Sequence, residues 1–265
     1  MIKGIVTRID YMNWLSFVDG CRSSFDGGRE NSLFPLVEAM DKVYQLAPEK
    51  SPFPRSKTNN ESIGLYDRCF FVCHRAFLSS ATAVGSSLPE DGEAISRRAL
   101  EAAKTCLAIK ADSANGEVWL NAQARANRWK QRGQGGMPKQ LRLKYGRVET
   151  ESLYQELQAE IGALSDFSVH FTPEYFSRYT WEETPRPEGG VKGSFGLSEG
   201  AIELGFLMLS KHHKLIIRVF DRCQDGKMLR NPDVKDAFDR VHALDEHFRQ
   251  LLGPTLDAMI FGEVR

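Results

Sequence analysis

The sequence predicts an all-α protein, a multi-helix bundle with at most one short β-hairpin, folded as a single domain over residues 1–265. Apolar residues recur at spacings of three and four along most of the chain, which is typical of amphipathic helices. Hydrophobic residues make up 42% and charged residues 26% of the 265 positions, enough to bury a full core. We expect helices at residues 5–20, 33–47, 61–86, 92–110, 116–131, 149–171, 199–222 and 233–261.

Four of these helices carry an apolar stripe that predicts which side faces the core. The stripes are Tyr66, Phe70, Cys73, Phe77 and Val84 in the third; Ile95, Ala99, Ala102, Ala103 and Cys106 in the fourth; Val118, Trp119, Ala122, Ala126 and Trp129 in the fifth; and Leu153, Leu157, Ile161, Leu164, Phe167 and Phe171 in the sixth.

Capping residues mark several helix boundaries. Asn231-Pro232-Asp233 supplies an N-cap side chain, a proline at the first helical position and an acid at the positive end of the helix dipole. Ser198-Glu199 likewise combines a capping side chain with an acid and predicts an N-cap at Ser198. The stretch 88–92 predicts a short connection between two helices, and Gly253-Pro254 should kink or end the last one.

Two stretches are predicted to be non-helical. Residues 48–60 contain three prolines and should form a loop. Residues 177–197 could form the hairpin, because Tyr179 to Trp181 and Val191 to Phe195 flank a turn-rich centre at 184–190.

Composition narrows the class of protein. No apolar run approaches the roughly 18–20 residues that span a bilayer, so we expect no membrane association. The N-terminus lacks the apolar stretch of a secretory signal. Five cysteines, an odd number at irregular spacing, do not suggest a disulfide framework. We interpret Cys69, Cys73 and Cys106 as small core residues and expect a cytoplasmic protein.

A basic stretch is the strongest functional signal. The chain has 35 basic and 35 acidic residues, yet eight basic and no acidic residues lie between Glu117 and Glu149. On a helix, Arg125, Arg128 and Arg132 form a ridge about 10 Å long, and guanidinium groups suit phosphate oxygens. A glycine-rich segment follows and would let a ligand approach the backbone closely. The predicted anion-binding residues are Arg125, Arg128, Arg132, Lys139, Arg142 and Lys144. The alternative is a solvated face that pairs with acidic residues elsewhere or with a second subunit.

Two pairs of side chains at helical spacing are candidates for catalysis. Asp166 and His170 lie one turn apart and away from the apolar stripe of their helix, so the carboxylate can orient the imidazole for acid–base work. Arg97 and Glu101 are spaced in the same way. In both cases the alternative is a local stabilising pair worth a few tenths of a kcal/mol.

His74, at the edge of an apolar stripe, is a further candidate, with a satisfied core histidine as the alternative. Gly196-Leu-Ser-Glu-Gly200 spells the serine-hydrolase elbow, but the elbow needs a central strand of a large sheet that this chain lacks. The histidines at 212, 213, 242 and 247 lack the H-E-x-x-H and E-x-x-H spacings of a helical metal site, and only Asp239 and His242 lie at the i, i+3 spacing of two possible ligands. We therefore expect neither a metal site nor a cofactor.

Short motifs also resemble known families. Arg97-Arg-Ala-Leu-Glu101, Trp119 and Asp166-Phe-Ser-Val-His170 resemble a widespread bacterial helical family of unknown function, over about residues 60–180. That resemblance implies an all-α fold, a mobile-element or defence context, and Arg97, Glu101 and His170 as positions to test. Arg68 and His74 are similar to the Arg-x4–6-His signature of HEPN ribonucleases, although they lie early in the chain. This second resemblance implies a metal-independent ribonuclease that acts on an RNA phosphodiester.

These observations favour a protein that forms a homo-oligomer and binds an anionic partner, above all nucleic acid, either RNA or DNA. Three alternatives stay open: a protein–protein scaffold without catalysis, a metal-independent ribonuclease that uses His170 or His74, and an enzyme that acts on a small molecule at Asp166 and His170.

Overall fold

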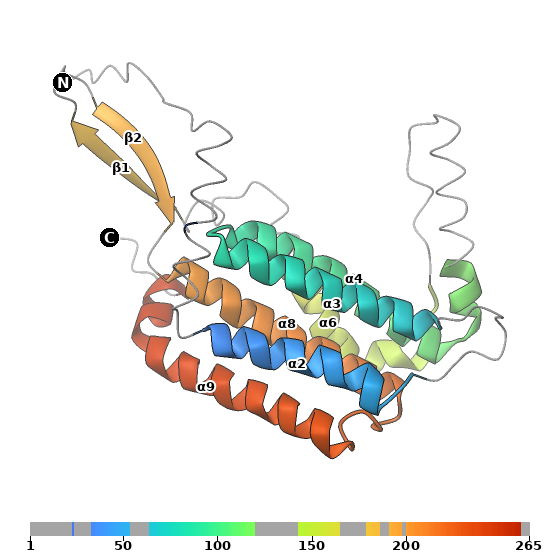
Figure 1. Cartoon of the computed structure of the whole chain (residues 1–265). Coiled ribbons are helices and arrows are strands. Elements are labelled where there is room, and N and C mark those ends of the chain that lie inside the picture. Colours follow the sequence, from blue (N-terminus) through green and yellow to red (C-terminus); the bar gives the residue numbers. More distant parts are fainter. Residues whose placement is uncertain are drawn as a thin grey trace, which may run out of the picture.

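The protein is a bundle of long helices with one short hairpin, as the sequence predicts (Figure 1). The computed structural model describes residue 23 and residues 33–53, 64–119, 143–164, 179–185, 191–197 and 200–260, and for the two strands and residues 254–260 it describes the backbone alone. The helices are α2 (Phe34–Lys50), α3 (Leu65–Gly85), α4 (Pro89–Ala111), the 3-10 helix η1 (Gly146–Thr150), α6 (Ser152–Leu164), α8 (Ala201–Cys223) and α9 (Pro232–Ile260).

The hairpin is confirmed. Strand β1 (Tyr179–Pro185) pairs antiparallel with β2 (Val191–Leu197), and Tyr179 stands opposite Leu197.

Helix α8 lies at the centre of the bundle and packs against α2, α3, α4, α6 and α9. Its sequence is apolar on most sides, and Leu207, Ile217 and Phe220 are at most 1% exposed. Aromatic rings connect it to its neighbours, because the Phe220 ring centroid lies 4.9 Å from that of Phe70 and 5.5 Å from that of Phe53. Burying each such side chain stabilises the fold by about 1.5–3 kcal/mol.

Helices α3, α4 and α8 approach most closely around Val84. A Cβ atom added at Gly92 of α4 would lie 2.6 Å from Val84 Cγ2 and 2.9 Å from the Ser80 carbonyl oxygen. One added at Gly205 of α8 would lie 2.9 Å from Val84 Cγ1. A side chain at either position would clash with Val84, so both positions require glycine.

The predicted start of α9 is confirmed, whereas the starts of α8 and α4 differ from the prediction. Asn231 is the predicted cap of α9, since its Oδ1 accepts hydrogen bonds from the backbone N–H groups of Asp233 and Val234, at 3.1 and 3.4 Å. The prediction at Ser198 was wrong, because α8 begins at Ala201 after Gly200, whose φ of 81° favours glycine. Helix α4 begins at Pro89 and not at residue 92, because proline suits the first helical position.

Proline ends neither α2 nor α9. Helix α2 continues through Pro48 to Lys50, and the Ser51 N–H still donates to the Ala47 carbonyl at 2.9 Å. A proline in the last turn removes only one hydrogen bond, so the helix tolerates it. Helix α9 likewise continues through Gly253-Pro254 to Ile260.

The helix predicted at 149–171 is divided into η1 and α6, and its part beyond Leu164 lies outside the described residues.

Cysteines 69, 73, 106 and 223 are buried, free thiols, which confirms the core role predicted for three of them. Within the described part of the chain, no helix combines the length and apolar character needed to cross a bilayer.

His213 is buried in the aromatic core beside α2 and α9. Its ring centroid lies 5.1 Å from that of Tyr44 and 6.3 Å from that of Phe238. Burial lowers the pKa of His213 to about 3, so the folded protein holds this ring neutral.

We expect Gly92→Ala to lower the free energy of unfolding by about 1–3 kcal/mol, because the new methyl group must displace backbone as well as a side chain. Gly162 of α6 is the matched control, since a Cβ there meets nothing within 4 Å. Gly162→Ala should raise stability by up to about 1 kcal/mol. Urea unfolding followed by circular dichroism measures both, and equal stability of the two variants would contradict the close approach.

We expect the stability of the protein to fall as pH decreases from about 6.5 towards 3, because the unfolded chain protonates His213 before the folded protein does. His213→Leu should make this loss shallower by up to about 1 kcal/mol per pH unit. Urea titrations at several pH values test this, with the exposed His247→Leu as the control. Parallel pH profiles for the parent and His213→Leu would contradict it.

Candidate anion-binding pocket

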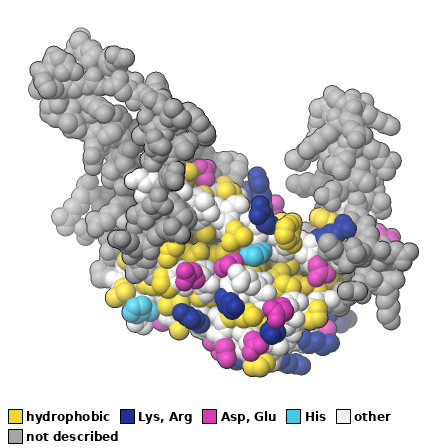
Figure 2. Space-filling view, in the orientation of Figure 1, with side chains coloured by type: hydrophobic (Ala, Val, Ile, Leu, Met, Phe, Trp, Pro, Cys, Tyr) yellow, Lys and Arg dark blue, Asp and Glu magenta, His cyan; other side chains and the backbone are white. Residues whose placement is uncertain are grey.

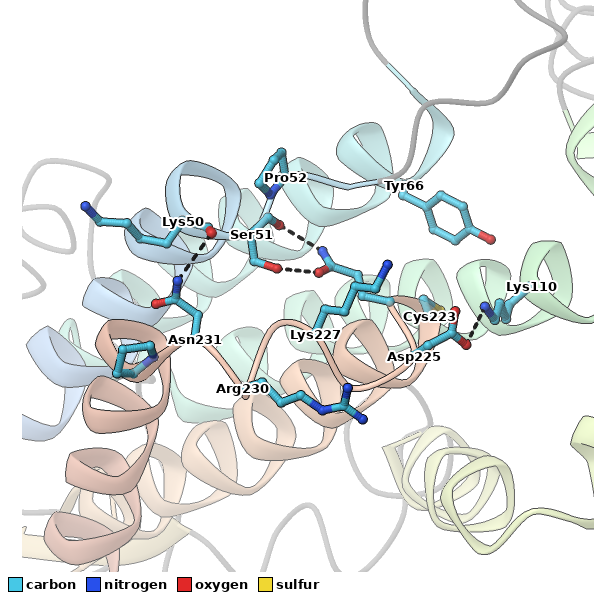
Figure 3. Close-up of a pocket in the computed structure, with 12 residues that line it drawn as sticks. Lys50, Ser51, Pro52, Tyr66, Lys110, Cys223, Asp225, Lys227, Arg230 and Asn231 are labelled. Carbon is cyan, nitrogen blue, oxygen red and sulfur yellow. Dashed lines mark hydrogen bonds and ion pairs between the residues drawn. The ribbon is translucent and has the colours of Figure 1, made fainter.

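A pocket of about 720 Å³ lies where α2, α4 and α8 end and α9 begins (Figure 3). Its walls come from segments far apart in the sequence, which the bundle brings together at one end. It is lined by Lys50, Ser51, Pro52, Tyr66, Lys110, Cys223, Gln224, Asp225, Lys227, Arg230, Asn231 and Pro232.

Hydrogen bonds between neutral side chains and backbone hold the pocket's frame. The buried pair Ser51 and Gln224 is joined twice: Ser51 Oγ donates to Gln224 Oε1 at 2.6 Å, and Gln224 Nε2 donates to the Ser51 carbonyl at 3.0 Å. Asn231 Nδ2 donates to the Lys50 carbonyl at 3.4 Å. These bonds hold the end of α2 against the connection between α8 and α9. The walls of the pocket are therefore positioned without a ligand.

The pocket has an excess of positive charge. Four cationic side chains, Lys50, Lys110, Lys227 and Arg230, line it together with one carboxylate, Asp225. Lys110 Nζ pairs with Asp225 at 2.8 Å, and this hydrogen bond lowers the pKa of Asp225 below its usual value. The Lys50 ammonium pairs with Glu49 at 3.0 Å and, more weakly, with Asp233 at 3.7 Å.

Lys227 and Arg230 are different, because neither forms an ion pair with any residue that the structure describes. Both are exposed and come from the short connection between α8 and α9. The Arg230 guanidinium lies over Gly226, whose φ of 76° belongs to the turn that follows α8. A fixed turn therefore presents two cations that can bind an anion without first breaking an ion pair.

Two neutral groups complete the lining. Burial raises the pKa of the Tyr66 hydroxyl well above its usual value and that of the Cys223 thiol to about 12, so both stay protonated at neutral pH. Cys223 is therefore not a nucleophile here. The ring of Tyr66 can stack on a planar ligand such as a base.

The predicted basic stretch is described only in part. Arg125, Arg128, Arg132, Lys139 and Arg142 lie outside the described residues. Lys144 is exposed, and its backbone N–H donates to Asn115 Oδ1 at 2.9 Å. Asn115 Nδ2 in turn donates to the carbonyls of Ala108 and Lys144, each at 2.6 Å. Lys144 thus lies at the end of α4, the same end at which Lys110 lines the pocket.

The predicted catalytic residues are not brought together into one site by the described part of the structure. Asp166 and His170 lie outside it. Arg97 Nε donates to Glu101 Oε1 at 3.0 Å, and their side chains are 27% and 52% exposed, which fits the local ion pair that we gave as the alternative. Such a pair contributes little to stability.

His74 has a partner that the sequence did not indicate. Its Nε2 lies 2.7 Å from Asp41 Oδ1 of α2, and its ring stacks on Tyr44 with centroids 5.0 Å apart. The side chain keeps 24% exposure, so this imidazole is both oriented and accessible from outside. It is the one predicted catalytic residue in the described part of the chain that a carboxylate from another helix orients.

A second polar cluster is buried. Ser96 Oγ lies 3.0 Å from His212 Nδ1, and His212 Nε2 lies 3.4 Å from Glu160 Oε2, a loose contact outside good hydrogen-bond geometry. Chiefly through His212, the pKa of Glu160 is lowered to about 2. The serine, histidine and carboxylate match a hydrolytic triad in composition, but Ser96 and His212 are only 3% and 1% exposed. No substrate carbonyl can reach Ser96 Oγ, so we interpret the cluster as a polar link between α4, α6 and α8.

Sequence reasoning missed the pocket, although one signal for it was present. The turn after α8 reads Asp225-Gly226-Lys227, followed three residues later by Arg230, and it precedes a strong helix N-cap. A cationic turn next to a helix N-terminus is a common anion-binding arrangement. Within the described residues, no group of histidine, cysteine and carboxylate side chains could hold a metal ion.

No protein-family model matches the chain, and comparisons with curated proteins and with solved structures found no match.

Proposed function

We propose that this protein binds nucleic acid, with phosphate groups held in the pocket between the α8–α9 connection and the ends of α2 and α4. The observation that carries the proposal is that Lys227 and Arg230 line this pocket without ion-pair partners among the described residues. Guanidinium and ammonium groups in this state bind phosphate oxygens with little competition from carboxylates.

Size and surroundings support a polymer over a small ion. About 720 Å³ lies within the range of pockets that take ligands of nucleotide size and exceeds what one phosphate needs. Lys144 and Arg147 are exposed at the same end of the bundle and form no ion pair with other described residues. The stretch of sequence that contains them, between Glu117 and Glu149, has six further basic residues and no acidic one, a composition that suits a chain of phosphates.

The experiment is a charge reversal of the two unpaired cations. Lys227→Glu/Arg230→Glu should weaken the binding of a fluorescent single-stranded RNA or DNA by about tenfold or more at low salt. The plot of log affinity against log salt should also become shallower by about one unit, because fewer phosphate contacts release counterions. Fluorescence anisotropy measures both quantities.

The matched control is Arg98→Glu/Arg240→Glu, which makes the same change in net charge at two exposed arginines outside the pocket lining. It should change the affinity by no more than about twofold. A parent protein that binds neither RNA nor DNA at low salt would refute the proposal and favour the scaffold alternative. Equal losses of affinity in the two double variants would show that nucleic acid binds outside the pocket.

A ribonuclease is the second candidate, and the contact between His74 and Asp41 favours it. A carboxylate 2.7 Å from an accessible imidazole orients the ring for proton transfer to or from a ribose hydroxyl. His74→Ala should then abolish cleavage of a labelled RNA while His247→Ala, at an exposed histidine of α9, leaves it unchanged. Full cleavage by His74→Ala, or none by the parent, would remove this candidate.

A further inference from the structure

The outer face of α3 exposes apolar side chains that the other described helices leave partly uncovered. Of the five large apolar side chains exposed in the described part of the chain, three belong to this helix: Phe71 at 63%, Val72 at 44% and Leu78 at 37%. Together with Arg75 they form what we call the α3 stripe. It lies opposite the buried side of α3, which includes Cys73, Phe77 and Val84.

Figure 2 shows apolar side chains at the described surface, interspersed with acidic and basic groups. An apolar group at the position of Phe71 gains free energy when a partner removes it from water.

We propose that the α3 stripe is a homodimer interface, in which the α3 helices of two copies pack antiparallel about a two-fold axis at Phe71. The order of the charges along the helix supports this arrangement. Asp67 lies four residues before Phe71 and Arg75 four residues after it, about 6 Å away in each direction.

A two-fold axis at Phe71 turns this order into charge complementarity. Phe71 then meets its own copy, Asp67 meets the partner's Arg75, and the symmetry repeats the ion pair on the other side. Leu78 meets the partner's Gly64, the N-cap of α3, which has no side chain to obstruct it. Neither Asp67 nor Arg75 forms an ion pair with another described residue of its own chain.

Other occupants fit this surface less well. A nucleic acid could stack a base on Phe71, but the Asp67 carboxylate would repel its phosphates, and the aliphatic Val72 and Leu78 offer it neither stacking nor charge. The charges of opposite sign at equal distances from an apolar centre are what a second copy of the same helix requires. The proposal is independent of the anion-binding pocket, which lies at the end of the bundle.

The first test uses a cysteine at the symmetry axis. In a Cys21→Ser background, Phe71→Cys should form an interchain disulfide under mild oxidation by copper phenanthroline, because the two thiols meet across the axis. Arg98→Cys, at an exposed site on α4, is the control and should stay monomeric in a non-reducing gel. The other four cysteines are buried. Cross-linking of Phe71→Cys no faster than Arg98→Cys would overturn the proposal.

The second test exchanges the charges. Asp67→Arg and Arg75→Asp should each raise the dimer dissociation constant by about tenfold, because each places two like-charged pairs across the interface. The double variant Asp67→Arg/Arg75→Asp restores both ion pairs and should restore the dimer. Sedimentation equilibrium measures the constants, and circular dichroism checks that each variant is folded. Failure of the double variant to recover would overturn the register.

An apolar control completes the series. Phe71→Asp should abolish the dimer, because it places two carboxylates side by side at the axis, whereas Leu251→Asp, at a leucine of α9 that is 60% exposed, should leave the dissociation constant unchanged. A parent that is monomeric at every concentration tested would overturn the proposal outright.

Discussion

The burial of α8 is the constraint on which the rest of the structure depends. This helix packs against five other helices, so almost every turn of it must present apolar surface in more than one direction. The neighbouring helices can come close enough only because Gly92 and Gly205 leave room for Val84. Dense packing of this kind has few voids, and it therefore fixes the axial positions of the helices relative to one another.

Those axial positions create the pocket. Helices α2, α4 and α8 all end at the same end of the bundle where α9 begins, so segments from residues 50–52, 66, 110 and 223–232 meet there. The ends of three helices carry partial negative charge, which lysines such as Lys50 and Lys110 at the final turns offset. Lys110 and Asp225 then neutralise each other, and Lys227 and Arg230 provide the positive charge that remains.

The same packing decides which polar groups can take part in chemistry. His212 and Ser96 lie at hydrogen-bond distance but are enclosed by α4, α6 and α8, so they contribute to cohesion between helices. His74 lies at the edge of the bundle, where Asp41 from α2 orients it and one side stays open. A buried histidine such as His212 therefore stabilises helix packing, whereas a partly exposed one such as His74 is accessible to a substrate.

Periodicity in the sequence was sufficient to predict the all-α class, the hairpin, the buried cysteines and most helix positions, because helix and strand spacing and capping are local properties. Asn231 illustrates this, since a cap needs only the next three residues. Local signals were less reliable at Pro48 and Ser198, where the costs of one missing hydrogen bond or one absent cap are small enough for packing to overrule them.

By itself, the sequence determined that these residues form amphipathic helices and that basic residues concentrate between Glu117 and Glu149. Only the tertiary structure decided that Ser51 meets Gln224, that Asp41 meets His74, and that Lys227 and Arg230 line a pocket without ion-pair partners among the described residues. Ser51 and Gln224 are separated by 173 positions along the chain. Contacts of that kind depend on how whole helices pack, and the spacing of residues within any one helix contains no information about them.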